Sequence, residues 1–225
     1  RDFANEENPN GQYASYVNGI GTNGGSRYIA PGQSFFVETS GSGSPALSMT
    51  NAVRVHSSDP FLKETQAAPA LRIQVSGEAG NDETVIYLAE GATSAFDAAF
   101  DASKLAGSEA LPQLGSFSEE GRKLSINGLS PELTEQQIEL SFSSANEGNH
   151  QLMFGGLESF DSGWNIYLED LLTGSLTDLR LYKSYSFTHQ NTSADGRFKL
   201  RLLKATVMEE VTGDGAGPFF YPNPA

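Results

Sequence analysis

The alternation of apolar and polar residues between Trp164 and Leu203 is the feature that most constrains the fold. Trp164, Ile166 and Leu168 are separated by Asn165, Tyr167 and Glu169, and the same two-residue period returns over residues 197–202. Successive side chains of a β-strand point to opposite faces, so this period indicates strands with one face in a core. The sequence Leu-Leu-Thr-Gly at 171–174 supplies a turn between two of them.

The same pattern recurs along the preceding chain, with turns about every 8 to 12 residues, as in β-sandwiches. Residues 84–89 are apolar on both sides, which is typical of a central strand. We expect about eight to ten strands between Leu71 and Leu203. The sequence therefore predicts an all-β fold, an antiparallel, jelly-roll-like β-sandwich with a β-rich segment before it. Further strands are expected at 71–75, 84–89, 114–118, 123–127, 137–142, 150–154, 176–179 and 185–188.

Breaks in the pattern suggest three parts: residues 1–65, 66–205 and 206–225. Residues 1–65 are interpreted as the tail of a preceding or adjoining β domain, 66–205 as the sandwich, and 206–225 as a glycine-rich linker followed by a new element. In the first part we expect strands at 12–17 and 33–38 and an extended pair within 46–56. One helix is predicted at 92–105, because apolar residues there recur three and four positions apart.

Composition excludes several classes of function. The chain has 28 acidic and 14 basic residues, a net charge of -14, which argues against nucleic acid or an anionic membrane surface as partner. The absence of cysteine removes disulfides, thiolate nucleophiles and cysteine-based zinc sites. No apolar run reaches the roughly 18 to 20 residues of a membrane-spanning helix.

Five stretches carry a resemblance to a known family: 54–61, 82–84, 92–105, 167–174 and 197–198. Together, over roughly residues 12–204, they resemble the β-sandwich region that precedes the sorting domain of proteins exported by the type IX secretion system. The stretch Tyr28–Val37 is similar to a segment found before that region in the same proteins. The final residues Phe220–Ala225 contain Tyr-Pro-Asn-Pro, which resembles the start of the sorting domain itself, and they follow a linker at 213–218.

This resemblance implies where the protein works and with what. It identifies residues 206–225 as a linker and the start of a secretion sorting domain. It also implies the type IX secretion machinery as a partner and a secreted or cell-surface location on the outer face of the bacterial outer membrane. The sequence departs from the family pattern in lacking the Asn-Pro-Tyr-Pro-Ser motif, of which only Asn8-Pro9-Asn10 could remain.

An acidic cluster is the candidate metal site. Glu90, Asp97 and Asp101 lie within a dozen residues, with two more carboxylates at 82–83. Oxygen ligands at this density suit a structural calcium ion, although the spacing does not match an EF-hand loop. The alternative is a solvated acidic rim whose repulsion is offset by a basic neighbour such as Lys104. Both interpretations stay open, and no other cofactor is expected.

Three tyrosines are the candidate ligand-binding residues. Tyr167, Tyr182 and Tyr185 would form a platform for a polysaccharide or cell-surface glycan if they share one exposed face. Trp164 alternates with core residues and is therefore expected in the core, whereas Tyr167 is expected to point outward.

No recognisable catalytic set is present. The three histidines, at positions 56, 150 and 189, have no metal-motif spacing, and no nucleophile elbow occurs. A glycosidase needs two carboxylates held about 5 to 10 Å apart, and Glu158 with Asp161 or Glu169 with Asp170 are the pairs to consider.

Three functions follow as hypotheses. The first is a non-catalytic β-sandwich module of a large exported protein, spacing or presenting upstream domains ahead of a sorting signal. The second is a carbohydrate-binding or adhesin module, which needs an exposed aromatic residue or a polar cleft. The third is a glycoside-hydrolase-type enzyme, which needs convergent carboxylates in a pocket.

Overall fold

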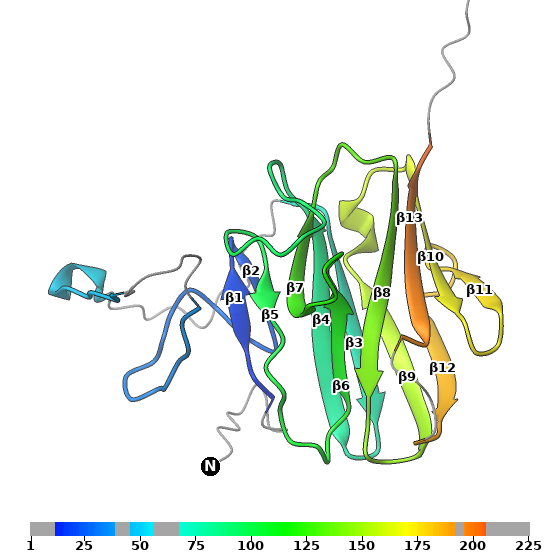
Figure 1. Cartoon of the computed structure of the whole chain (residues 1–225), viewed down its shortest axis with the longest axis horizontal. Coiled ribbons are helices and arrows are strands. Elements are labelled where there is room, and N and C mark those ends of the chain that lie inside the picture. Colours follow the sequence, from blue (N-terminus) through cyan, green and yellow to red (C-terminus); the bar gives the residue numbers. More distant parts are fainter. Residues whose placement is uncertain (1–11, 39–45, 56–67, 192–195, 206–225) are drawn as a thin grey trace, which may run out of the picture.

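The computed structural model describes residues 12–38, 46–55, 68–191 and 196–205, and its secondary structure is almost entirely β (Figure 1). Two short 3₁₀ turns, η1 (Asn51–Val53) and η2 (Leu157–Ser159), are the only helical elements among these residues. The strands are β1 (Ser15–Val17), β2 (Ile20–Thr22), β3 (Ala70–Gly77), β4 (Gly80–Leu88), β5 (Ala102–Ser103), β6 (Gln113–Phe117), β7 (Lys123–Leu129), β8 (Glu135–Ser143), β9 (Gly148–Gly155), β10 (Trp164–Asp170), β11 (Ser175–Asp178), β12 (Ser184–His189) and β13 (Phe198–Lys204).

One eleven-stranded sheet contains every strand except the β1–β2 hairpin. Its order is β11-β10-β13-β8-β6-β7-β4-β3-β9-β12, with β5 beside β7. All pairs are antiparallel except β4 and β7, which run parallel. The predicted all-β sandwich is therefore confirmed, with one parallel pair that the expectation of a wholly antiparallel fold did not include.

The sheet folds over so that its two halves enclose one core. Apolar residues of β3, β4 and β9 from one half meet those of β8, β10 and β13 from the other. Each strand contributes every second residue, which is the alternation visible in the sequence. The fully buried members include Leu71, Ile73, Ile86, Leu114, Leu140, Leu152, Ile166, Leu168, Phe198 and Leu200.

Strand β4 is buried on both faces, as its continuous apolar sequence predicts. Ile86 faces the main core, whereas Val85 and Tyr87 pack on the outside with Ile20 and Ile126 in a second cluster. The β1–β2 hairpin covers this outer patch. Residues 12–25 therefore belong to the packing of the sandwich.

Polar contacts fix the hairpin on the sheet. Asn18 donates to the Tyr87 hydroxyl at 3.2 Å, and Arg72 donates to the Gly21 carbonyl at 2.9 Å. The boundary expected near residue 65 stays a prediction, because residues 56–67 lie outside the described part of the chain.

The helix expected at 92–105 is wrong. The segment forms turns followed by β5. Carboxylates bond the backbone there: Asp101 Oδ2 accepts from the Asp97 amide at 2.6 Å, and Asp97 Oδ1 accepts from the Ala99 amide at 3.1 Å. Such local bonds compete with a helix. The spaced aromatics pack separately, because Phe96 lies against the Arg122 guanidinium and Phe100 packs against the outer cluster.

The strand expected at 33–38 is also wrong, and the extended pair within 46–56 forms no strand over residues 46–55. In Figure 1 these segments project to one side of the sandwich. Apolar sequence alone does not make a strand without a neighbouring strand to pair with.

The folded sheet closes where β12 approaches the end of β10. Arg197 lies beside β13 and donates to the Thr188 carbonyl of β12 at 2.8 Å, and the Tyr185 hydroxyl of β12 donates to Asp170 of β10 at 2.9 Å. No helix within the described residues has the length and apolarity of a membrane span.

Candidate functional site

The three tyrosines expected to bind a glycan do not form one platform. Tyr167 is partly buried on the outer face of β10. Tyr182 lies before β12 with 64% of its surface exposed. Tyr185 packs against the main core, where its hydroxyl is used by Asp170. Trp164 is 2% exposed, which confirms its predicted place in the core.

The acidic cluster is divided among different partners. Both carboxylate oxygens of Asp101 accept backbone amides, from Asp97 at 2.6 Å and from Gly128 at 2.7 Å. Burial raises the pKa of Asp101, and these two amide bonds partly offset the rise. Glu90 is exposed. Over the described residues, no three histidine, aspartate or glutamate side chains lie close enough to hold a metal ion.

Lys104, the basic neighbour expected to balance this cluster, pairs with Asp82, one of the two further carboxylates at 82–83. Its Nζ lies 2.5 Å from Asp82 Oδ2. Asp82 also accepts from the Leu114 amide at 2.7 Å and from Asn23 at 3.0 Å. Asp82 is 1% exposed, so this network joins the hairpin, β4 and β6 inside the fold.

One of the two carboxylate pairs considered for glycoside hydrolysis does not converge. Glu169 and Asp170 are consecutive in β10 and so point to opposite faces of the sheet. Glu169 pairs with Arg201 at 2.6 Å on the outer face, and Asp170 pairs with Arg197 at 2.7 Å inside. In the other pair, Asp161 accepts from the Gly163 amide at 2.8 Å.

Two histidines that are distant in sequence meet inside the sandwich. His150 of β9 and His189 of β12 have ring centroids 5.8 Å apart, and both are 5% exposed. Phe142 and Phe187 pack against His150, at 5.3 and 5.7 Å. The pairing of β9 with β12 produces this cluster, and sequence spacing carries no signal of it.

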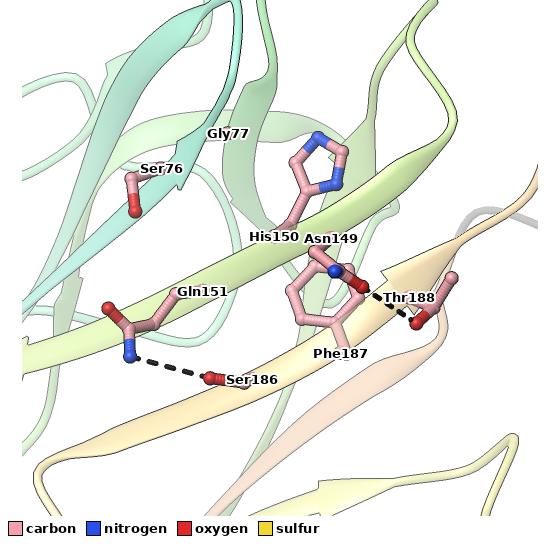
Figure 2. Close-up of a pocket in the computed structure, with 8 residues that line it drawn as sticks. All are labelled: Ser76, Gly77, Asn149, His150, Gln151, Ser186, Phe187 and Thr188. Carbon is pink, nitrogen blue, oxygen red and sulfur yellow. Dashed lines mark hydrogen bonds between the residues drawn. The ribbon is translucent and has the colours of Figure 1, made fainter.

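A polar groove lies over one end of β3, β9 and β12 and has a volume of about 510 Å³. Figure 2 shows its polar side chains gathered over these strands, with Asn149 bonded to Thr188 and Gln151 bonded to Ser186. We use "polar groove" for the hollow lined by Ser76, Gly77, Asn149, His150, Gln151, Ser186, Phe187 and Thr188.

The floor of the polar groove is built from the buried cluster. His150 and Phe187 point into the core from the same strands that turn Asn149 and Thr188 outward. Gly77 is required at the end of β3, because a Cβ there would lie 2.7 Å from the His150 ring. Sequence reasoning missed this site, since single polar residues between core positions look like any solvent-facing strand positions.

Residues 26–38 and 46–55, which we call the N-terminal arm, expose an unusual number of apolar side chains. Phe36 is 75% exposed and Val37 57%. Within the described residues, Glu38 of this arm accepts from Ser103 at 2.7 Å and pairs with Arg122, and the Phe36 ring contacts the Tyr13 ring at 5.9 Å between centroids. The exposed apolar residues are Tyr28, Ile29, Phe35, Phe36, Val37, Leu47, Met49, Val53 and Val55.

Comparison with known proteins yields a family. Residues 3–202 match the family described as "Domain of unknown function (DUF8693)". No curated protein and no solved structure matches the chain. The matched range takes in both the N-terminal arm and the sandwich, so the two belong to one family unit.

Proposed function

The chain belongs to the DUF8693 family, and from this starting point we propose that it is a non-catalytic β-sandwich module of a large exported bacterial protein. It spaces or presents an adjoining domain of the same polypeptide, and the N-terminal arm provides the contact. The arm lies within residues 1–65, which we interpret from the sequence as the tail of a preceding or adjoining β domain.

The exposed apolar surface of the arm is the observation that carries the proposal. Proteins that act alone rarely expose large contiguous apolar patches, and such patches mark interaction sites. None of the nine exposed apolar residues of the arm lies in a strand in the described part of the chain, and one of them, Val53, lies in η1. A neighbouring domain that covered them would bury this surface.

The arrangement of Glu169 and Asp170 favours this role over hydrolysis at that pair. A glycosidase needs an acid and a second carboxylate on the two sides of one bond. Glu169 and Asp170 are separated by the sheet, and each is held by an arginine.

Delivery by the type IX secretion system is part of the proposal and rests on the resemblance to its cargo proteins. Truncation of the full-length gene after Gly217 is expected to leave the product in the periplasm, as measured by cell fractionation. A truncated protein that still reaches the cell surface would exclude this route.

The arm is tested by replacing Phe35, Phe36 and Val37 with serine. In the isolated chain the melting temperature should stay unchanged, because these side chains lie outside the core. In the full-length protein the same change should lower the unfolding temperature of the adjoining domain in calorimetry. Leu176→Ser with Leu181→Ser is the control, since both leucines are exposed at the opposite edge of the sandwich. Equal effects of the two variants on the adjoining domain would overturn the proposed contact.

A further inference from the structure

A strip of the outer surface over β9, β12 and the end of β3 differs in charge from the outer face of β8, β10 and β13, and it ends at the Arg72–Glu83 ion pair on β3 and β4. On the face of β8, β10 and β13, Glu169 pairs with Arg201, and Lys199 stands opposite both Glu139 and Glu169. The outer face of β9 and β12, with the adjoining end of β3, carries no charged side chain. Its members are Gln74, Ser76, Asn149, Gln151, Met153, Ser184, Ser186 and Thr188.

The chain has 14 basic and 28 acidic residues, so 42 of its 225 residues are charged. An uncharged strip of eight outward-facing side chains is therefore unusual for it. Solvent-facing strand positions commonly carry lysine and glutamate, which also protect against edge pairing. Amides and hydroxyls occupy these positions here, and the polar groove lies among them.

The side chains of the polar groove are held in position. Thr188 donates to Asn149 Oδ1 at 3.1 Å, and Gln151 donates to Ser186 at 3.4 Å. These pairs cross from β9 to β12 at consecutive outward positions, about 7 Å apart along the strands. The buried rings of His150 and Phe187 support the strands from below. The groove is therefore a preorganised surface, which lowers the entropic cost of binding.

Hydrogen-bonding capacity remains at this surface. Asn149 uses its oxygen for Thr188, and across the described residues its amide nitrogen has no bond. The Ser76 hydroxyl likewise has no bond to the residues that the structure describes. Amides and hydroxyls both donate and accept, and so match ligands that carry many hydroxyl groups.

We propose that the polar groove binds an uncharged polysaccharide, with successive sugar units along β9 and β12 meeting the Asn149–Thr188 and Gln151–Ser186 pairs. An anionic glycan is disfavoured because no cationic side chain lines the groove and the chain has a net charge of -14. This site goes beyond the proposed module role, since docking through the arm does not require the groove.

Affinity electrophoresis of the isolated chain tests the site. The gels contain mannan, galactomannan, xyloglucan, laminarin or dextran as neutral probes, and alginate or heparin as anionic probes. At least one neutral polysaccharide should retard the protein, and neither anionic one should. Asn149→Ala and Gln151→Ala should each weaken that binding at least tenfold.

The matched control is Gln137→Ala, which removes the same amide from an exposed position on the opposite outer face. Its binding should equal that of the unchanged chain, and thermal melts should show that all three variants are folded. The site is overturned if no neutral probe retards the protein, if the anionic probes retard it equally, or if Gln137→Ala weakens binding as much as the groove variants. A failure here leaves the calorimetric test of the arm unaffected, so the two proposals are judged separately.

Discussion

Asp170 and Arg197 place a charge pair inside the sandwich where the folded sheet closes. Arg197 Nε and Nη2 donate to the two Asp170 oxygens at 3.0 and 2.7 Å, and Tyr185 adds a third bond. Phe187 and Phe198 flank the guanidinium at 4.9 and 5.0 Å. The pair links β10, β12 and the start of β13, so it fixes the closure of the fold.

Removing one partner of this pair should be costly. Asp170→Ala leaves Arg197 buried without its counter-ion and is expected to lower the free energy of unfolding by about 3 to 5 kcal/mol. Glu169→Ala is the control, because it breaks the neighbouring but more exposed pair with Arg201 and should cost at most about 1 kcal/mol. Urea unfolding of both variants measures the two losses in the free energy of unfolding. Similar losses would show that the buried pair stabilises the fold no more than the exposed pair does.

The pH dependence of stability should reflect the same pair. Burial by itself would raise the pKa of Asp170, but hydrogen bonds from Arg197, Tyr185 and the Leu172 amide, with the arginine charge, lower the pKa below its ordinary value. The contribution of Asp170 to the free energy of unfolding is therefore complete above the unfolded-state pKa of its carboxyl, and it is lost as pH falls through the folded-state pKa. Urea midpoints of the unchanged chain should decline in this acidic window more steeply than those of Asp170→Ala. If the urea midpoints of the two proteins declined in parallel with pH, Asp170 would not be the cause of the acid-dependent loss of stability.

Two other carboxyls act in the opposite direction. Burial raises the pKa of Glu83 and of Asp101, against the opposing effects of Arg72 on the first and of backbone amides on the second. Their contribution to stability therefore grows as pH falls from neutral toward the ordinary carboxyl range. The Asp170→Ala variant keeps Glu83 and Asp101. The difference between its pH curve and that of the unchanged chain therefore reports the effect of Asp170 alone.

At the scale of strands, alternation predicted the sandwich well because one-sided burial dictates it. The pattern of β10 and β13 in the sequence is the burial pattern in the structure. The expected helix and the strand at 33–38 failed for another reason: apolar residues there pack on an outer patch or remain exposed, and local sequence does not reveal which surface they meet. The polar groove escaped prediction because it depends on the pairing of β3, β9 and β12.

Matched leucines test the assigned core. Leu200→Ala in β13 removes a fully buried side chain and should cost about 2 to 5 kcal/mol. Leu176→Ala in β11 removes the same atoms from a side chain that is 58% exposed and should change stability by about 0.5 kcal/mol or less. Chemical denaturation of the two variants gives both values, and a small loss for Leu200→Ala would place the core elsewhere.

At the scale of the whole molecule, the sandwich and the N-terminal arm are built differently. The sandwich buries its apolar residues between two halves of one sheet, whereas the arm leaves its own exposed. A module that presents another domain needs a rigid body and a surface for contact. In the proposed role, the sandwich is the rigid body and the arm is the contact surface.

Hydrogen exchange followed by mass spectrometry, comparing the isolated chain with the full-length protein, tests the role of the arm. Amides at 26–38 and 46–55 should exchange rapidly in the isolated chain and become protected in the full-length protein. The strands of the sandwich should be equally protected in both, which serves as the internal control. Unchanged exchange at 26–38 and 46–55 would show that no adjoining domain covers the arm.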